Sequence, residues 1–347
     1  MGRMSLGAKI KLGISAALII LVILASNPEA VGKALTNVDP ILIGIVVLLY
    51  LINMVFKAYR WGVLMRNTGH SVSFRTTFTA FSLSQAINNL IPGRVIGETS
   101  RIMEVNSKEG VEVGKGLATV VTERVMDFVV LTLLSVTSLI LLLAYIIEDL
   151  RGFLIFMVLA MVLANMFFIY ILAKHTLMVR IGGWGTKIIK KVVKGEKGEN
   201  YALKLTGLVG SFNEALSFKG NRKLLIWASV LTMIIWANEI FRLYLIMEAI
   251  GADVSIVAVI ATASLASLSA VLLSAGSGNV VMSSAVFTAS GLSYEVAATA
   301  GLLSALTSIW LSVPVCLLTM LVDHRKGSAA AKGSSNNKSK KVKRGFH

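Results

Sequence analysis

The chain has 347 residues, of which 55% are hydrophobic and only 15% are charged, and it carries a formal net charge of +16. Its mean hydropathy is +0.77, so it has too few polar residues to cover a soluble globule of this size, and a soluble globular protein is excluded. The composition predicts an all-α polytopic membrane protein.

Long apolar segments follow one another along the chain, and most of them reach the roughly 20 residues that a helical membrane span needs. They cover about residues 10–25, 40–57, 116–145, 153–173, 224–249, 255–274 and 295–322. The first segment has the basic start and small residues of a signal peptide. Its apolar run is long, however, and its removal would leave an odd number of spans, so we interpret it as a span.

Two stretches of the chain are predicted to be re-entrant or broken helices. Residues 72–92 mix apolar side chains with Ser, Thr and amides, and residues 255–290 are interrupted by a Gly-rich turn. Glycine permits sharp turns, and proline removes a backbone donor and disfavours helix at the preceding residue. The predicted hinge residues are Pro92, Gly93, Gly97, Gly276 and Gly278.

The distribution of Lys and Arg orients these segments, because short cytoplasmic loops of membrane proteins collect basic residues. With a cytoplasmic N-terminus, only Lys33 and Arg151 fall on the outer side. This assignment of the basic residues requires that the segment 72–92 enters the membrane from the inner side and returns to it. It also requires that the segment 255–290 enters and leaves from the outer side. We therefore predict about six full spans, two re-entrant hairpins, an inverted repeat as in many transporters, and both termini on the cytoplasmic side of the cell membrane. Eight complete spans fit the same hydropathy.

Two membrane halves are separated by a basic loop. Residues 1–173 form the first half and residues 224–323 the second, and a basic tail at 324–347 is predicted to be disordered. The loop at 174–223 spaces Lys along Ile and Val, which is typical of an amphipathic helix at the membrane interface. Because the basic residues flank spans and the basic tail has no interleaved aromatics, we expect membrane lipids with anionic headgroups as partners, and no nucleic acid.

Charged residues cluster after the first predicted hinge. Arg94, Glu98 and Arg101 are spaced i, i+4 and i+7, so they share one helix face beside an expected helix N-terminus. Guanidinium groups on such a face can bind a phosphate, while the carboxylate orients them or binds an amine. An ion-pair ladder next to the membrane is the alternative interpretation.

Two more polar patches lie inside apolar segments, where charge is costly and usually functional. Glu123 and Asp127 flank Arg124, which leaves a spare negative charge that needs a cation such as Arg60, Arg94, Arg101 or Arg242. Asn238, Glu239 and Arg242 form the second patch. Since each half contributes one patch, we expect a common polar cavity between the halves.

No metal site, cofactor or catalytic residue is predicted. Cys316 is the single cysteine, and the four histidines show no ligand spacing. The chain also lacks the Gly-x-x-x-x-Gly-Lys-Ser/Thr loop that binds nucleotide phosphates. We therefore predict that the chain is not an enzyme. The alternative is an intramembrane enzyme that uses Glu123 or Asp127 as a base.

The first-half motif resembles a known family. The residues that carry the resemblance are Arg60-Trp61, Asn89, Pro92-Gly93-Arg94, Gly97-Glu98, Arg101 and Glu123-Arg124 with Asp127. They are similar to the lysylphosphatidylglycerol synthase transmembrane-region family, also catalogued as UPF0104 or flippase-like membrane proteins. The resemblance implies a module that moves modified anionic phospholipids between leaflets, or one that accompanies a lipid-modifying transferase.

This chain departs from the family pattern in two places. It shows no fused transferase domain, so aminoacyl transfer does not carry over. The second-half signature, usually Pro-Gly-Gly-x-Gly followed by Glu, reads Ser274-Ala275-Gly276-Ser277-Gly278-Asn279-Val280-Val281, with Val281 at the Glu position. The flexible break is kept while a charge is lost.

From residues and resemblance together we predict a translocase of an anionic phospholipid or polyprenyl-phosphate-linked lipid. Arg60, Arg94, Glu98 and Arg101 would bind the headgroup, and Asn89, Glu123, Arg124, Asp127, Asn238, Glu239 and Arg242 would line or stabilise the path. The alternatives are a membrane partner of a separately encoded lipid-modifying transferase, an intramembrane transferase, and a transporter of a small ion or solute.

Overall fold

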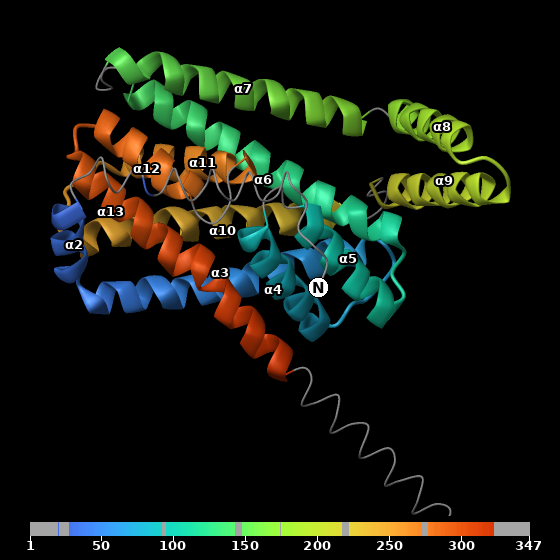
Figure 1. Cartoon of the computed structure of the whole chain (residues 1–347), viewed down its shortest axis with the longest axis horizontal. Coiled ribbons are helices and arrows are strands. Elements are labelled where there is room, and N and C mark those ends of the chain that lie inside the picture. Colours follow the sequence, from blue (N-terminus) through green and yellow to red (C-terminus); the bar gives the residue numbers. More distant parts are fainter. Residues whose placement is uncertain are drawn as a thin grey trace, which may run out of the picture.

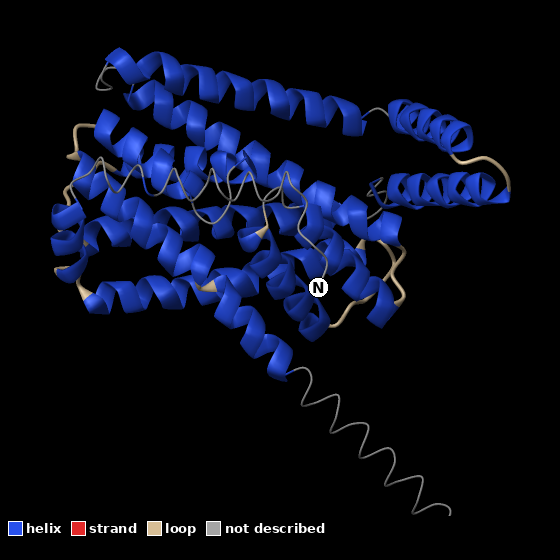
Figure 2. Cartoon of the chain, in the orientation of Figure 1, coloured by secondary structure: helices blue, strands red, loops and turns tan. Residues whose placement is uncertain are grey.

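The computed structural model describes residues 20, 28–91, 95–142, 148–173, 175–216, 222–272 and 277–322. Within these ranges all regular structure is helical, as Figures 1 and 2 show. The predicted all-α class is confirmed for this part of the chain. The predicted span at 10–25 lies almost entirely outside the described residues, as do the basic tail and the hinge residues Pro92, Gly93 and Gly276.

Four helices in the described part of the chain are long and apolar enough to cross a membrane. They are α3 (Pro40–Arg66), α6 (Val113–Leu142), α10 (Arg222–Ala249) and a last helix that runs from Tyr294 to Val322. At 1.5 Å per residue, a helix of 27 residues such as α3 is about 40 Å long, more than the hydrocarbon core of a bilayer. Large apolar side chains such as Ile140 and Leu318 are exposed on them, as expected of lipid-facing helices.

Helix α3 continues beyond the predicted segment 40–57. It begins with Pro40 in its first turn, and Asp39 caps it by accepting hydrogen bonds from the N–H groups of Ile41 (2.8 Å) and Leu42 (3.3 Å). The hydropathy falls at Lys57 and Arg60, but the helix runs on to Arg66. Both cations are paired with carboxylates from other helices, so the helix can carry them inside the bundle.

Helices α3 and α10 pack along their length in opposite directions (Figure 1). At one end the N–H of Asp39, before α3, donates to the carbonyl of Ala249, the last residue of α10, over 2.9 Å. Near the other end Leu64 of α3 packs with Ala228 and Leu231 of α10. This antiparallel pair places the polar residues of α3 opposite those of α10.

Two pairs of short helices pack against these long ones. Helix α4 (Phe74–Leu90) pairs with α5 (Val95–Glu109), and α11 (Ile256–Leu272) pairs with α12 (Ser277–Ala289). Each helix has 17 residues or fewer, which is short for a full crossing. Gly97 allows the close packing in the first pair, because a Cβ there would collide with the Asn88 side chain and the Ser84 carbonyl.

The second short pair lies against the last helix. α13 (Tyr294–Ser304) begins that helix, and a Cβ on Gly301 would lie 2.7 Å from Cα of Val280 in α12. The helix then widens into a π-helical turn, η1 (Ala305–Trp310). A proline ring clashes with the carbonyl four residues earlier, which for Pro314 is that of Trp310, and a widened turn relieves such a clash. Pro314 thus lies just after an irregular turn.

The remaining helices are α2 (Pro28–Thr36), α7 (Glu148–Ala173), α8 (His175–Val192) and α9 (Glu196–Leu216). α7 contains the predicted span at 153–173. The basic loop, predicted to hold one amphipathic helix, instead contains two, because α8 and α9 form a hairpin that projects from the bundle (Figure 1). The side chain of Asn67 anchors α9 by donating to the carbonyl of Ala215 over 2.7 Å.

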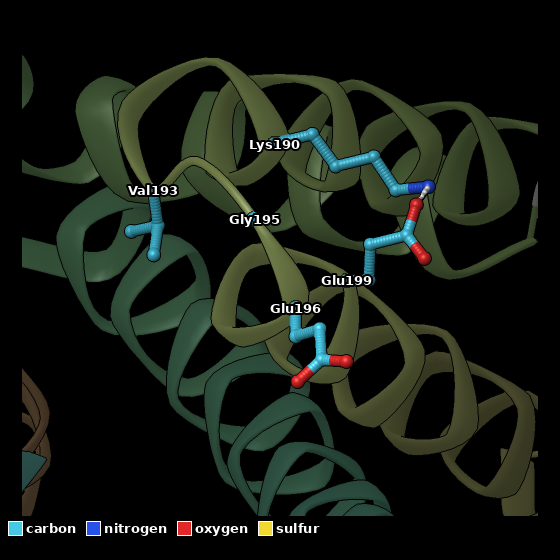
Figure 3. A pocket seen from close by; sticks show the side chains of 5 residues that line it. All are labelled: Lys190, Val193, Gly195, Glu196 and Glu199. Carbon is cyan, nitrogen blue, oxygen red and sulfur yellow. Dashed lines mark ion pairs between the residues drawn. The ribbon is translucent and has the colours of Figure 1, made fainter.

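A small pocket lies at the turn between α8 and α9 (Figure 3). Lys190, Val193, Gly195, Glu196 and Glu199 line it, and Lys190 Nζ lies 3.5 Å from Glu199 Oε1. Both charged side chains of this pair are more than half exposed. Exposed ion pairs contribute little to stability, and none of the buried charged residues lines the pocket, so we do not place function there.

Candidate functional site

A network of six charged side chains is enclosed between α3, α5 and α6. It consists of Arg60 on α3, Glu98 and Arg101 on α5, and Glu123, Arg124 and Asp127 on α6; we call these six residues the central ion network. Arg60, Arg101 and Glu123 are almost completely buried. The three arginines balance the three carboxylates, so the network has no net charge.

Arg60 binds the two acidic residues of α6 together. Its Nη2 lies 2.7 Å from Glu123 Oε1, and its Nη1 lies 2.6 Å from Asp127 Oδ1. Nη1 also donates to the hydroxyl of Thr232 on α10 over 2.9 Å. Because Glu123 and Asp127 are four residues apart on one helix face, a single guanidinium fork can reach both. Arg60 therefore ties α3, α6 and α10 to one another.

Arg101 joins the acidic residues of α5 and α6. Its Nη2 lies 2.5 Å from Glu98 Oε2 and 2.7 Å from Glu123 Oε2. Its guanidinium carbon lies over the Trp61 ring at 4.7 Å and near the Phe81 ring at 5.5 Å, distances at which a cation is attracted to an aromatic face. The aromatic rings thus cover the side of Arg101 that the carboxylates leave free.

Arg124 and Glu98 form the more accessible edge of the network. They are paired with each other, and their side chains are 29% and 13% exposed. Asn88 of α4 also donates to Glu98 Oε1 over 3.4 Å. Burial disfavours the charged form of Glu98, but its ion pairs with Arg101 and Arg124 favour that form. Glu98 therefore stays ionised while it is in this network.

The spare negative charge expected on α6 is neutralised by residues that the sequence analysis proposed for it. Arg60 and Arg101 both reach Glu123, whereas Arg242 pairs with Glu239 on its own helix. Arg94, the remaining candidate, lies outside the described residues. Of the predicted phosphate-binding residues Arg94, Glu98 and Arg101, the structure therefore describes only Glu98 and Arg101, and both form ion pairs.

A second group of charged side chains lies further along α3 and α10. Lys57 Nζ of α3 lies 2.7 Å from Glu239 Oε1 of α10, and Glu239 Oε2 lies 2.9 Å from Nη1 of Arg242. The guanidinium carbon of Arg242 lies 5.1 Å from the centre of the Tyr50 ring. We call Lys57, Glu239 and Arg242 the middle cluster. Hydropathy alone does not reveal Lys57 as part of this cluster, because the predicted apolar segment 40–57 ends there.

Polar side chains connect the two groups along the contact between α3 and α10. Trp236 donates from its indole nitrogen to Asp127 Oδ1 over 3.2 Å, and Asn53 donates to the carbonyl of Ile235 over 3.3 Å. We call this line the α3–α10 seam, and it comprises Tyr50, Asn53, Lys57, Arg60, Thr232, Trp236, Glu239 and Arg242. Since Tyr50 and Arg60 are ten residues apart on one helix, the seam is about 15 Å long.

The two predicted amides have different surroundings. Asn89 of α4 donates to the carbonyl of Ile309 in η1 over 3.1 Å and to the hydroxyl of Ser312 over 2.8 Å. It thus links the first short pair to the irregular turn of the last helix instead of facing the central ion network. The buried Oδ1 of Asn238 has no hydrogen-bond partner among the described residues. Gly278 is buried at the start of α12.

Comparison with known proteins identifies the chain's relatives. The model of the family described as the lysylphosphatidylglycerol synthase TM region matches residues 9–316. A UPF0104 membrane protein of Methanothermobacter thermautotrophicus is 27% identical over 300 residues, which cover 83% of this chain and 87% of that protein. A UPF0104 membrane protein of Pyrococcus horikoshii is 24% identical over 324 residues, 89% of this chain and 94% of that protein.

A UPF0104 membrane protein of Methanocaldococcus jannaschii is also similar, with 24% identity over 307 residues that cover 86% of this chain and 89% of that protein. No solved structure matches the chain. The family match extends over most of both predicted halves and includes every residue of the central ion network and the middle cluster. The chain therefore belongs to the lysylphosphatidylglycerol synthase transmembrane-region family and is an integral, multi-pass membrane protein.

Proposed function

We propose that this protein translocates an anionic phospholipid, or a polyprenyl-phosphate-linked lipid, between the two leaflets of the cell membrane. The observation that supports this most is the central ion network continued by the α3–α10 seam. Together they place charged and polar side chains through the interior of helices that are otherwise apolar. Charge at this depth is costly and is usually retained for a function. A polar line along a span is a route that a headgroup can follow while its acyl chains stay in lipid.

Arg124 and Glu98 form the entrance in this proposal. They are the more exposed pair of the network, so an incoming phosphate meets Arg124 first. The phosphate replaces the Glu98 carboxylate as the partner of Arg124, since both are oxyanions that accept from a guanidinium. Glu98 is then free to bind a cationic group on a modified headgroup. The ion pairs of Glu123 with Arg60 and Arg101 hold the surrounding helices in place.

The proposed topology follows the charge distribution and the short helix pairs. The α4–α5 and α11–α12 pairs come from opposite halves of the chain, and each consists of helices too short for a comfortable crossing. We assign them as re-entrant hairpins of opposite entry side, related by an inverted repeat, with both termini cytoplasmic. Broken helices that meet near the middle of the membrane are typical of transporter binding sites.

The α8–α9 hairpin is assigned to the anionic surface of the inner leaflet. Trp184, Ile188 and Val192 of α8 are exposed and spaced four residues apart, so they form one apolar stripe. Lys187 and Lys191 are exposed beside this stripe. An apolar stripe flanked by Lys fits a helix that lies in the headgroup region, where each basic residue contributes about 1 kcal/mol with anionic lipids.

This assignment predicts a lipid-dependent protection of α8. In nanodiscs that contain phosphatidylglycerol, amide hydrogen exchange of α8 should be slower than in phosphatidylcholine. Replacing both Lys187 and Lys191 by Gln should remove about 2 kcal/mol of attraction and abolish the difference. Lys190→Gln is the matched control, because Lys190 points to the other side of α8, toward Glu199. Equal loss of protection in the control would contradict the assignment.

The proposed activity can be tested with the purified protein in sealed proteoliposomes. Phosphatidylglycerol with a fluorescent label on its headgroup side or acyl chain is placed in both leaflets. A reductant that cannot cross the membrane then bleaches the label in the outer leaflet. We expect bleaching of nearly all label when the protein is present and of about half without it. Chromatography of the lipids afterwards should return unchanged phosphatidylglycerol. A new lipid product without movement would instead support an intramembrane transferase.

A further inference from the structure

We propose that the middle cluster is a second binding site for the phosphate of an anionic lipid, distinct from the central ion network and about half-way along α3 and α10. The inference rests on the proposed function, because it describes a point at which a translocating headgroup pauses. A lipid headgroup and inorganic phosphate both offer a phosphate oxyanion to such a site. The net charge of the cluster favours the lipid phosphodiester.

The charge balance of the middle cluster differs from that of the central ion network. Lys57 and Arg242 each carry one positive charge and Glu239 carries one negative charge, which leaves a net charge of +1. Glu239 is the only carboxylate within ion-pair distance of either cation among the described residues. A net charge inside apolar helices needs a counter-ion. A phosphodiester, which carries a single negative charge, would supply it.

The donors of the middle cluster are not all used. Arg242 is 3% exposed, and its Nη1 is bound to Glu239, but its buried Nε has no acceptor among the described residues. An unpartnered buried donor on a cation is costly. Lys57 adds an ammonium group that can rotate toward a ligand. An oxyanion placed between the two cations would therefore find donors from both.

The cluster can also be reached from outside the bundle. The side chains of Lys57 and Glu239 are 21% and 23% exposed, whereas Arg60 and Glu123 in the central ion network are almost completely enclosed. Helices α3 and α10 are both long and apolar enough to cross a membrane, so these partly exposed groups lie at membrane depth in the proposed topology. A lipid headgroup can enter such a site from the side, with its acyl chains outside.

The position of the cluster connects it to the proposed entrance. Lys57 lies one helical turn from Arg60 on α3, about 4.5 Å along the axis. Glu239 and Arg242 follow Trp236, which is bound to Asp127 of the central ion network. A phosphate that leaves the network would thus meet the next cations of the α3–α10 seam after about one turn. The middle cluster lies far from both ends of α3 and α10, as an intermediate site requires.

Lipid retention by the purified protein tests the inference. The protein is exchanged into neutral detergent with short-chain phosphatidylglycerol or phosphatidylcholine, and bound lipid is counted by native mass spectrometry. We expect Lys57→Met and Arg242→Met to weaken phosphatidylglycerol binding at least about tenfold, which corresponds to about 1.4 kcal/mol. Lys57→Arg should retain it. Lys108→Met is the matched control, because Lys108 forms a surface pair of the same 2.7 Å length with Glu104.

Glu239→Gln separates binding from a purely structural role. It raises the net charge of the cluster from +1 to +2, so it should tighten the binding of phosphatidylglycerol although it breaks two ion pairs. If Glu239→Gln weakens binding as the Lys57 and Arg242 variants do, or if none of them changes it, the inference is wrong. Displacement of the lipid by millimolar inorganic phosphate would also overturn the assignment to a lipid. A protein that retains phosphatidylglycerol through Lys57 and Arg242 but moves no lipid would contradict only the proposed function.

Discussion

Arg60→Met is expected to destabilise the folded protein by about 3 to 5 kcal/mol, the cost of removing one partner from a buried ion pair. The substitution leaves Glu123 and Asp127 buried with fewer cations, and it removes the link from α3 to Thr232 of α10. Methionine fills a volume similar to that of arginine, so the loss of stability reflects mainly the loss of the positive charge. Thermal unfolding in a mild detergent micelle measures it.

The double variant Arg60→Met with Asp127→Asn provides the control. It removes one charge of each sign and returns the network to neutrality, so it should be more stable than Arg60→Met alone by more than the additive expectation. Lys33→Met, in an exposed pair with Glu29, should change the stability by no more than about 0.5 kcal/mol. If Arg60→Met behaves like Lys33→Met, the central ion network does not stabilise the helices.

Glu123→Gln is expected to have an effect of similar size, because Glu123 is the carboxylate that two buried arginines share. Its Oε1 and Oε2 lie 2.7 Å from Arg60 and Arg101, and the amide offers one neutral acceptor in place of two charged ones. Two guanidinium groups then face each other with less negative charge between them. We expect a loss of about 3 to 5 kcal/mol, measured by the same unfolding assay.

Glu98→Gln is the comparison for this variant. Glu98 also contacts two arginines, but its pair with Arg124 lies at the more exposed edge of the network. Water can solvate Arg124 after the substitution, so the loss should be clearly smaller than for Glu123→Gln. Equal losses would show that the edge is as enclosed as the centre, and the proposed entrance would then have to lie elsewhere.

The sequence predicts well those features that lie within one helix. The apolar segments predict α6, α10 and the last helix to within a few residues, and the spacing of Glu123 and Asp127 predicts a shared face. These patterns depend on local periodicity, which is fixed by helix geometry. The first-half motif also predicts the family correctly.

Pairings between helices were predicted less completely, because they depend on tertiary packing. Arg60 was one of several candidates for the acidic residues of α6, and only the packing of α3 on α6 and α10 selects it. Lys57 looked like the end of a span, since hydropathy cannot show that Glu239, 182 residues away, neutralises it. The contact of Asn89 with the π-helical turn likewise has no signal in either segment alone. The role of Arg94 stays a prediction.

The central claim is that an anionic headgroup enters by replacing the Glu98 carboxylate as the partner of Arg124. Lipid transport by the Arg124→Gln variant in proteoliposomes tests this claim most directly. The rate of leaflet exchange is measured for labelled phosphatidylglycerol, with Lys108→Met as the matched variant. We predict that Arg124→Gln lowers the rate at least about tenfold, which corresponds to about 1.4 kcal/mol, while Lys108→Met exchanges lipid at the wild-type rate. Exchange by Arg124→Gln at the wild-type rate would contradict the account.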